Sequence, residues 1–557
     1  MAVRENVGLD RDPIPYGSLA RKPAGINLGA YALDGDPAPV RSARVRDAGR
    51  GLQRRATDPP LDRNARHRPN RATEAQSPSP RSVQGGGLGR GARAHRLIAY
   101  MLRSIDPASG HELAAFPELD QAEVEAALER AWGSRHAWRD VGIDLRTALM
   151  RSVAGVLRAE KDRFARLLTS EMGKPIVEAE AEIEKCAWTA GWIADNAARL
   201  LADEPIESTA TMSYVRFQPL GVILAVMPWN FPFWQAFRAA LPALVAGNTM
   251  LLKHSSNVPQ SALAIEDVFR EAGVPKGVFQ TLLIGSAAVE GIIADHRVAG
   301  VTLTGSEAAG AMVAATAGKT LKKSVLELGG SDPFIVLADA DVKAAATVAC
   351  RARNQNNGQS CIAAKRFIVV ESVADEFEKH FSNAVAALKV GDPMDRANQV
   401  GPLARADLVD DLERQVKESV RLGARAVTGG NRLDGAGYFF QPTVLTDVRP
   451  GMPVYHEETF GPVAAVIRAH NAEDALRVAN DTDFGLGSSI WTADVEQGRK
   501  LAERVEAGLV FVNGMVASDA RLPFGGIKRS GYGRELSSYG IKEFTNIQTV
   551  WVGPPKT

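Results

Sequence analysis

A cysteine in a polar, glycine-containing segment is the first candidate for chemistry in this chain of 557 residues. Cys361 ends the run Asn-Asn-Gly-Gln-Ser-Cys, and a glycine-bearing turn leaves a thiol within reach of a substrate. Backbone N–H groups of such a turn favour the thiolate, which is the nucleophilic form. A lone cysteine is more often a core residue, and the alanine-rich helical surroundings of Cys186 and Cys350 predict that role for them. The polar setting of Cys361 does not fit the role of a core residue.

A glutamate between two leucines is the second candidate. Glu327 lies in the run Val-Leu-Glu-Leu-Gly-Gly over residues 325–330, at the end of an apolar strand. Burying a carboxylate is costly unless it is paired or used, and burial would raise its pKa toward the range of a general base. A structural ion pair or an exposed strand end explains the same pattern equally well.

The third candidate is an asparagine between prolines. Asn230 lies in the run Met-Pro-Trp-Asn-Phe-Pro over residues 227–232, directly after a predicted strand over 222–226. The two prolines fix the backbone, so the amide of Asn230 could donate a hydrogen bond to a developing oxyanion. The alternative is a rigid aromatic turn that only packs.

These residues must be positioned by alternating short strands and helices. The predicted strands cover residues 222–226, 249–252, 279–283 and 301–303. The predicted helices cover residues 259–272, 286–294 and 307–317. Such alternation predicts a parallel sheet with right-handed crossovers, which binds ligands at the carboxyl ends of its strands. Thr304-Gly305-Ser306 follows the last strand and could place a phosphate at a helix N-terminus, although it is not a GxGxxG motif.

Further elements are predicted on both sides of this region. Helices are predicted before it over 122–132, 148–171 and 178–201, followed by an extended arm over 209–217. A second α/β set follows, with strands over 334–337 and 367–370 and helices over 343–353, 373–388, 405–422, 472–480 and 495–507. A last strand is predicted over 543–552. It is far in sequence from either sheet, so we expect it to pair with another subunit.

Charge is distributed unevenly along the chain. Residues 1–97 carry 17 Arg and one Lys against nine Asp and Glu, a net charge of +9, whereas residues 98–557 carry −8. Residues 1–100 show no sustained apolar period and are predicted to form a disordered basic leader. Two interpretations remain: a tail that binds polyanions, or upstream sequence translated because the start was misassigned. The abrupt globular pattern after Met101 favours the second.

Composition excludes several classes of protein. The formal net charge of +1 argues against a surface built to bind nucleic acid. No apolar stretch is long enough to span a bilayer and no secretory signal is visible, so neither a membrane nor a secreted protein is expected. Three cysteines indicate a reducing, cytoplasmic compartment without a disulfide framework. No Cys/His cluster has the spacing of a zinc site, so no metal is expected.

Taken in order, the motifs resemble those of the NAD(P)-dependent aldehyde dehydrogenases over residues 101–552. The matching stretches are PWNFP (228–232), TGS (304–306), LELGG (326–330), GQSC (358–361), EETFGP (457–462) and PFGG (523–526). Within this family the sequence is most similar to bacterial succinate-semialdehyde dehydrogenases of the NADP-using type, through residues 252–260 and 355–366.

The resemblance implies an α/β fold in three parts. It has a Rossmann-like cofactor domain, an α/β catalytic domain and a β oligomerisation arm. The expected boundaries are 101–200 and 220–328 for the cofactor domain, 201–219 for the arm, 329–529 for the catalytic domain and 530–557 for the C-terminal segment. The arm and the strand over 543–554 would join subunits as homodimers or homotetramers.

The resemblance also implies the chemistry. Cys361 would attack the aldehyde carbon, and the thiohemiacetal would lose hydride to the nicotinamide and become a thioester. Asn230 and the backbone N–H of Cys361 would form the oxyanion hole. Glu327 would activate the water that hydrolyses the thioester.

Seven residues are implied to bind the cofactor. They are Trp229, Lys253, Ser256, Gly305, Ser306, Glu458 and Phe460. Lys253 matches a lysine on the adenosine ribose, Gly305 and Ser306 fall at the pyrophosphate, and Glu458 and Phe460 match residues around the nicotinamide and its ribose. NAD-preferring relatives commonly have Glu three residues after the lysine. The small, neutral Ser256 therefore predicts a preference for NADP, with NAD as the alternative.

Two residues are implied to bind the substrate. Arg238 matches an arginine that holds the carboxylate of succinate semialdehyde in relatives, and Ser518 is the second candidate. A further arginine of some relatives is Gln355 here, and Ala363 offers no thiol for the disulfide switch of others. We expect oxidation of succinate semialdehyde. The alternatives are glutarate semialdehyde or other aliphatic aldehydes and, from a different class, a polyanion-binding protein acting through its basic leader.

Overall fold

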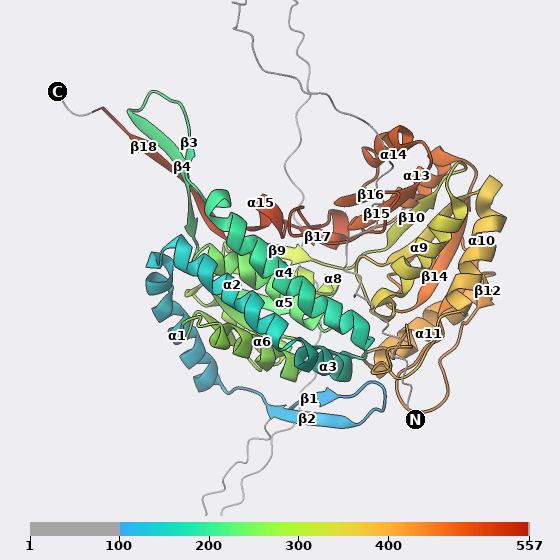
Figure 1. Ribbon diagram of the computed structural model, residues 1–557, viewed down its shortest axis with the longest axis horizontal. Helices are drawn as coiled ribbons and strands as arrows, with labels where there is room; N and C mark the ends of the chain where they lie inside the picture. The colour runs from blue at the N-terminus through green and yellow to red at the C-terminus, as the bar shows by residue number, and fades with distance from the viewer. Residues whose placement is uncertain (1–100, 555–557) are drawn as a thin grey trace, which may run out of the picture. The chain divides into compact units, whose positions relative to one another are not determined.

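The computed structural model describes residues 101–554, and the expected disordered leader lies outside them. Two large sheets follow one another along this part of the chain, each with helices on both faces (Figure 1). The remaining strands form a three-stranded sheet and a hairpin of β1 (Met101–Ile105) and β2 (Glu112–Pro117).

The first sheet has six strands in the order β17-β9-β8-β5-β6-β7. Its parallel strands are β5 (Val222–Met227), β6 (Thr249–His254), β7 (Phe279–Thr281), β8 (Val298–Thr304) and β9 (Lys323–Glu327), and β17 (Gly531–Tyr532) runs antiparallel to β9. The predictions of β5 to β8 are confirmed. Along β5, Ile223 and Ala225 pack into one buried cluster and Val222 and Leu224 into another. Both faces are covered, which is why such strands are apolar throughout.

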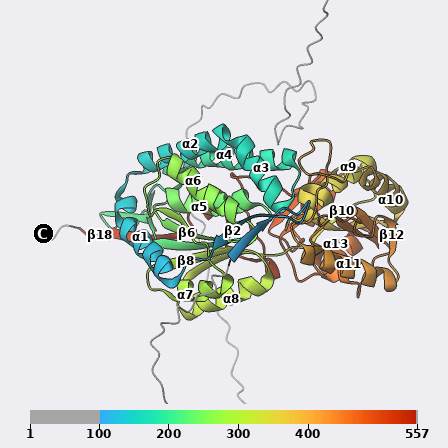
Figure 2. The same cartoon turned by 90° about the horizontal axis from the view of Figure 1, so that it is seen from below.

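Helices cover the two faces of the first sheet (Figure 2). One face carries α2 (Ile143–Ala159), α3 (Lys161–Met172), α4 (Ile176–Leu200), α5 (Pro232–Val245) and α6 (Pro259–Glu271). The other carries α1 (Gln121–Asp140), α7 (Val289–Ala294) and α8 (Glu307–Lys319). The single helix predicted over 148–171 is wrong, because the backbone leaves helical geometry at Glu160 (φ −103°, ψ 16°) and divides it into α2 and α3.

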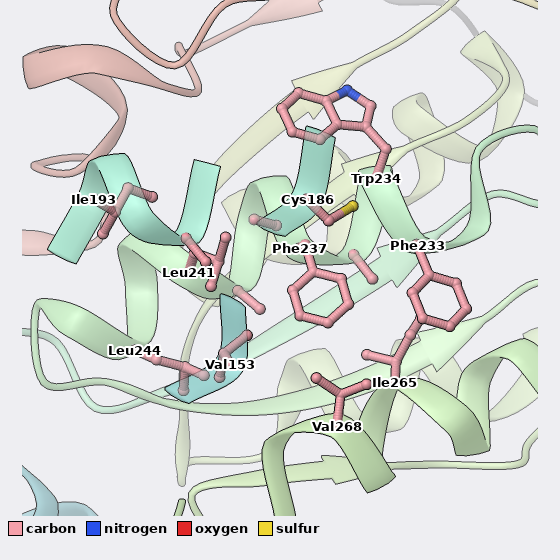
Figure 3. Close-up of a cluster of buried hydrophobic side chains, with 14 of the residues drawn as sticks. Val153, Cys186, Ile193, Phe233, Trp234, Phe237, Leu241, Leu244, Ile265 and Val268 are labelled. Atoms are coloured by element: carbon pink, nitrogen blue, oxygen red, sulfur yellow. The ribbon is translucent and has the colours of Figure 1, made fainter. Parts of the chain in front are cut away.

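Helix α5 is absent from the sequence predictions. It is buried along its whole length, so it has no polar face and no amphipathic period, and Pro242 interrupts its interior. Figure 3 shows how its side chains pack against those of α2, α4 and α6, with Phe233, Phe237, Leu241 and Leu244 among the labelled residues. Because α5 begins two residues after Asn230, this packing anchors the loop that carries Asn230.

The second sheet has seven strands in the order β12-β13-β14-β11-β10-β15-β16. They are β10 (Asp332–Val336), β11 (Ala364–Val370), β12 (Arg425–Thr428), β13 (Thr443–Thr446), β14 (Val463–Ala469), β15 (Gly487–Trp491) and β16 (Leu509–Val512). Only β12 is antiparallel to its neighbour. Strands β10 and β11 confirm the predictions. The other five were not predicted, because short apolar runs cannot be distinguished from buried helix by pattern alone.

Helices also pack on both faces of the second sheet. One cluster contains residues of α9 (Val342–Asn354) and α10 (Glu371–Ala386). The other contains residues of α11 (Ala406–Arg421), α13 (Ala472–Asn480) and α14 (Val495–Ala502), with the short α12 (Pro453–His456). The long helices confirm the predictions, except that α14 ends at Ala502.

The third sheet has the order β18-β4-β3 and consists of β3 (Glu204–Pro205), β4 (Met212–Pro219) and β18 (Thr545–Val552). Every residue of β18 pairs with β4 of the same chain. This pairing uses one edge of β18 and leaves the other without a strand partner among residues 101–554, so pairing of the last strand with another subunit stays a prediction. After the second sheet, the chain returns to the first sheet as β17. It then passes through α15 (Ser537–Gly540) and continues into β18, which lies beside β4.

The three cysteines do not belong to a metal-type cluster in this part of the chain. Within residues 101–554, no three His, Cys, Asp or Glu side chains come together in a way that could hold a metal ion. All three cysteines are free: Cys186 and Cys350 are buried, as predicted for core cysteines, whereas Cys361 is partly exposed. None of the helices in the same residues is long and apolar enough to cross a membrane.

Candidate active site

Cys361 follows a turn of left-handed residues between α9 and β11. Asn356, Asn357 and Gly358 have φ values of 57°, 58° and 75°. A Cβ on Gly358 would lie 2.3 Å from the backbone of Gly461, so only glycine fits this close approach. The turn therefore has a fixed shape, and it presents Cys361 where the backbone emerges from it.

Two buried basic side chains hold the carbonyl groups around Cys361. Arg353 donates to the carbonyl oxygen of Gly358 at 2.5 Å. Lys365 Nζ donates to the carbonyl oxygen of Cys361 at 2.8 Å and to those of two neighbours at 3.0 and 3.1 Å. The sequence analysis missed both residues. Their signal is a basic side chain within an apolar helix or strand on each side of the cysteine, since a buried charge must have partners.

Contrary to the expectation that the turn favours the thiolate, the surroundings of Cys361 favour the protonated thiol. Burial raises the pKa of Cys361 to about 12, and the positive charges of Arg238 and Lys365 oppose the rise. The nearby carboxylates of Glu458 and Glu327 add to it. A thiol of this pKa becomes a strong nucleophile only when a base takes its proton or positive charge is added beside it.

Glu327 ends strand β9 with its side chain buried, at 2% exposure. Neither carboxylate oxygen has a hydrogen-bond partner within the described residues. Burial raises the pKa of Glu327 to about 8, with Arg238 opposing the rise and Glu535 adding to it. A Cβ on Gly525 would lie 2.7 Å from Glu327 Oε1, so a glycine backbone closes one side of the carboxyl. Such a group can take up and release a proton near neutral pH.

Asn230 is joined to the turn that precedes Cys361. Its side-chain Nδ2 donates to the carbonyl oxygen of Gln359 at 3.1 Å, across 129 residues of sequence. Its own carbonyl accepts from Asn356 Nδ2 at 2.8 Å, and the Asn356 N–H donates to Glu178 at 2.6 Å. Among residues 101–554, Asn230 Nδ2 donates only to Gln359, so one of its two N–H groups is left for another oxygen.

Lys253 and Ser256 lie at the carboxyl end of β6. The ammonium of Lys253 is buried and forms no ion pair among the described residues. Burial lowers its pKa, and the charge of Glu118 opposes the change. Ser256 is exposed just beyond the strand. An unpaired buried cation beside an exposed neutral hydroxyl fits the hydroxyl and phosphate oxygens of a nucleotide.

Gly305 and Ser306 connect β8 to α8. Ser306 caps the helix, since its Oγ accepts from the N–H of Ala309 at 3.4 Å. The Gly305 N–H donates to the carbonyl oxygen of Glu327 at 3.0 Å. The helix N-terminus proposed for a phosphate is thus bonded directly to the strand that ends in Glu327.

Glu458 is brought next to Cys361 by shared partners. Its Oε1 lies 3.4 Å from Lys365 Nζ and accepts from the N–H of Gly330 at 3.0 Å. A Cβ on Gly330 would lie 2.7 Å from the carbonyl oxygen of Cys361, so these groups are in direct contact. Glu458 keeps about a fifth of its side chain exposed (22%), which leaves it accessible to a ligand.

Trp229 and Phe460 meet each other, although 231 residues separate them. Their rings pack edge to face with centroids 5.7 Å apart. They belong to a small apolar cluster with Met172, Val258 and Ala404. The structure thus brings the two predicted aromatic cofactor residues together.

Arg238 differs most from its expected surroundings. It is buried, at 1% exposure, and forms an ion pair with the buried Glu535. Its Nη2 donates to Thr304 Oγ1 at 3.3 Å, and its guanidinium lies 4.5 Å from the ring centroid of Phe524. Glu535 was not a sequence candidate. Its carboxylate pairs with Arg238, whose charge still acts on Cys361 and Glu327, and the predicted contact of Arg238 with a substrate carboxylate stays a prediction.

Ser518 lies at a different cation. Its Oγ accepts a hydrogen bond from Lys185 Nζ at 2.6 Å, across 333 residues of sequence. Lys185 was not a sequence candidate either. Its only signal is a lysine at the edge of an alanine-rich helix, which is too common a pattern to single out.

Together, these features combine a partly exposed cysteine, a buried glutamate with a raised pKa and an asparagine joined to the cysteine's turn in one α/β structure. The model of the aldehyde dehydrogenase family matches residues 99–550. The chain belongs to this family.

Similar proteins agree with this assignment. The chain is 52% identical over 451 residues to the probable succinate-semialdehyde dehydrogenase (NADP+) of Synechocystis sp., covering 81% of this chain and 99% of that protein. It is 52% identical over 454 residues to succinate-semialdehyde dehydrogenase (NADP+) 1 of Mycobacterium tuberculosis, with the same coverage.

Solved structures show the same fold. Succinic semialdehyde dehydrogenase from Streptococcus pyogenes, in complex with NADP+, aligns with a TM-score of 0.80 at 39% identity, covering 81% of this chain and all of that one. Succinate-semialdehyde dehydrogenase from Burkholderia pseudomallei aligns with a TM-score of 0.79 at 38% identity, covering 82% and 95%.

Proposed function

We propose that this enzyme oxidises succinate semialdehyde to succinate and reduces NADP. The observation that supports the chemistry is the convergence of Cys361, Glu327 and Asn230 from three separate segments. The choice of substrate and cofactor is supported by relatives of this name at 52% identity over nearly their full length. The neutral, exposed Ser256 beside Lys253 supports NADP over NAD.

In the proposed reaction, the thiol proton of Cys361 passes to the carboxylate of Glu327, which releases it to solvent, and Sγ attacks the aldehyde carbon. The carbonyl oxygen becomes an oxyanion, and the free N–H of the Asn230 amide and the backbone N–H of Cys361 donate to it. Lys365 holds the carbonyl of Cys361, which keeps this backbone in place. Because these donors are fixed before the reaction, they stabilise the charge without reorganising.

The residues around Lys253 fit a dinucleotide. Lys253 and Ser256 would hold the adenosine ribose with its 2′-phosphate, Ser306 and the start of α8 the pyrophosphate, and Glu458 the nicotinamide ribose. Bound NADP supplies the acceptor for the hydride that leaves the substrate carbon. Glu327 then takes a proton from water, and the water oxygen attacks the thioester, releasing succinate and the Cys361 thiolate.

A steady-state panel tests this function. Succinate semialdehyde, glutarate semialdehyde and butanal are each assayed with NADP and with NAD. We expect the highest kcat/KM for succinate semialdehyde with NADP. A higher kcat/KM for either of the other aldehydes contradicts the proposed substrate, and a higher value with NAD contradicts the proposed cofactor.

Ser256→Glu is expected to reverse the cofactor preference. A carboxylate there repels the 2′-phosphate of NADP and accepts a hydrogen bond from the 2′-hydroxyl of NAD. The kcat/KM with NADP should fall by about 100-fold or more, since like charges in contact cost several kcal/mol. The measurement is kcat/KM with each cofactor. Ser256→Ala, which keeps the site neutral, is the control and should still prefer NADP.

Hydrolysis of the thioester is expected to depend on the ionisation of Glu327. Only the carboxylate form can take a proton from water, and its pKa is raised to about 8 by burial. The rate of hydrolysis should therefore rise with pH up to about 8 and level off above it. Rapid-quench measurement of acyl-enzyme decay between pH 6 and 9.5 checks this, and a flat profile would contradict the assignment.

We further propose that the third sheet joins subunits into a homodimer or homotetramer. Strand β18 is an edge strand, and edge strands are ready to pair with another chain. Large apolar side chains of this sheet are exposed, including Ile547 (64%), Trp551 (56%) and Met212 (54%). Ile547→Asp combined with Trp551→Asp should lower the mass measured by light scattering to that of a smaller species. An unchanged mass would contradict the proposal.

We place the enzyme in the cytoplasm. The three cysteines of the chain are free, and Cys361 must stay reduced to act as a nucleophile. A compartment that keeps thiols reduced accounts for the free cysteines and keeps Cys361 in its reactive form.

A further inference from the structure

Asn356 is a buried residue of the left-handed turn before Cys361, and its side chain joins two other segments. Its Nδ2 donates to the carbonyl oxygen of Asn230 at 2.8 Å and to that of Gln359 at 3.0 Å. Both N–H groups of this amide are therefore used, which fixes the direction of the side chain. The φ of 57° at this residue is one that asparagine tolerates better than most residues.

The hydrogen bonds of Asn356 and Asn230 form a closed set around the carbonyl of Gln359. Asn230 Nδ2 donates to the same carbonyl oxygen of Gln359, at 3.1 Å. The backbone carbonyl of Asn230 is thus held by Asn356, and its side-chain amide is held by Gln359. Both the place of Asn230 and the orientation of its amide therefore depend on the turn that contains Asn356.

Glu178, in the first turn of α4, holds Asn356 from a distant part of the chain. Its Oε2 accepts from the backbone N–H of Asn356 at 2.6 Å, across 178 residues of sequence. A buried N–H must find an acceptor, so this carboxylate satisfies the backbone of Asn356 and fixes its position. The side chain of Glu178 has no part in the reaction as proposed above.

The next turn of α4 holds the other segment of the site. Glu182 accepts from the N–H of Trp234 at 2.9 Å and forms a buried ion pair with Lys174. Lys174 Nζ lies 4.1 Å from the ring centroid of Phe231. Because Glu182 is one turn after Glu178, one face of α4 holds both the asparagine loop and the cysteine turn.

We propose that Glu178 is a positioning residue of the oxyanion hole, which acts through Asn356 on the amide of Asn230. This inference rests on the proposed function, in which Asn230 donates to the oxyanion. An oxyanion forms when Cys361 attacks the aldehyde and again when water attacks the thioester. A displaced donor slows both steps, because its stabilising effect depends on being in place before the charge develops.

The first test compares kcat in Glu178→Ala and Glu178→Gln with succinate semialdehyde and NADP. Alanine removes the acceptor, so kcat should fall about tenfold to 100-fold while KM changes by less than about threefold. Glutamine keeps an oxygen that can accept, so kcat should stay within about threefold of wild type. The matched control is Glu184→Ala, which removes an exposed glutamate of α4 paired with Arg158 and should leave kcat unchanged. An unchanged kcat in Glu178→Ala, or an equal fall in Glu178→Gln, overturns the proposal.

A double variant tests whether Glu178 acts through Asn230. Asn230→Ala alone should lower kcat about 100-fold or more. Adding Glu178→Ala to Asn230→Ala should lower kcat by no more than about twofold, because the donor that Glu178 positions is already absent. A further fall as large as that in the wild-type background overturns the proposal. If Asn230→Ala itself leaves kcat unchanged, the proposed oxyanion hole fails instead, so the two failures are distinct.

Alkylation of Cys361 by iodoacetamide distinguishes a displaced donor from a damaged site. This reaction forms no oxyanion, so its rate in Glu178→Ala should stay within about twofold of wild type. Asn356→Gly is a second variant, which removes the two side-chain donors but adopts the left-handed φ freely. It should lower kcat as Glu178→Ala does and also leave alkylation unchanged. A loss of alkylation in proportion to kcat in both variants overturns a role specific to the oxyanion hole.

Discussion

Cys361→Ala is expected to lower kcat for aldehyde oxidation by about four orders of magnitude or more. Loss of a nucleophile removes the covalent route entirely, and the remaining binding groups supply only a small part of the rate. The other two cysteines of the chain are buried in apolar clusters and cannot replace it. The measurement is the rise of NADPH absorbance with succinate semialdehyde at saturating NADP.

The control for this variant is Cys350→Ala, which removes a thiol from the core of the second sheet. It should keep kcat within about twofold while lowering the melting temperature slightly, because it leaves a small cavity. Cys361→Ala should lower kcat but leave the melting temperature nearly unchanged, since the side chain of Cys361 is partly exposed. Substantial residual activity in Cys361→Ala, with an intact fold, would exclude a cysteine-bound intermediate.

Glu327→Gln is expected to have the second-largest effect, lowering kcat by about 10² to 10⁴. The amide has nearly the same shape but cannot accept a proton from water, so hydrolysis of the thioester should become limiting. A burst of one NADPH per active site should therefore precede the slow steady state. Glu496→Gln, at an exposed glutamate of α14 paired with Arg499, is the control and should retain full kcat.

Glu327→Gln should also change how the stability of the fold depends on pH. In the unfolded chain a glutamate ionises near its ordinary pKa of 4.5, whereas burial raises the pKa of Glu327 to about 8 in the fold. Between these values the folded state holds a proton that the unfolded state lacks, so the contribution of Glu327 to stability falls as pH rises. In thermal melts from pH 5 to 8, the melting temperature of Glu327→Gln should rise relative to that of wild type as the pH increases. A constant difference would contradict the raised pKa.

The sequence by itself determined strands β5 to β8 and most of the long helices, and it singled out the candidate reacting groups. Strands β5 to β8 are apolar on both faces because helices cover both, and this local property is visible as short apolar runs. Glu327 between two leucines and Cys361 in a polar turn were identifiable because their types conflict with their surroundings. The buried state of Glu327 follows from its strand.

Only the tertiary structure decided which distant residues become partners. Three contacts join segments far apart in sequence: Asn230 with Gln359, β18 with β4, and Arg238 with Glu535. Local periodicity reports whether a side chain is buried, but not which charge or carbonyl it meets. Arg238 and Lys185 are both cations in helices. Packing gave Arg238 a buried carboxylate and gave Lys185 the hydroxyl of Ser518, and neither partner is visible in the local sequence.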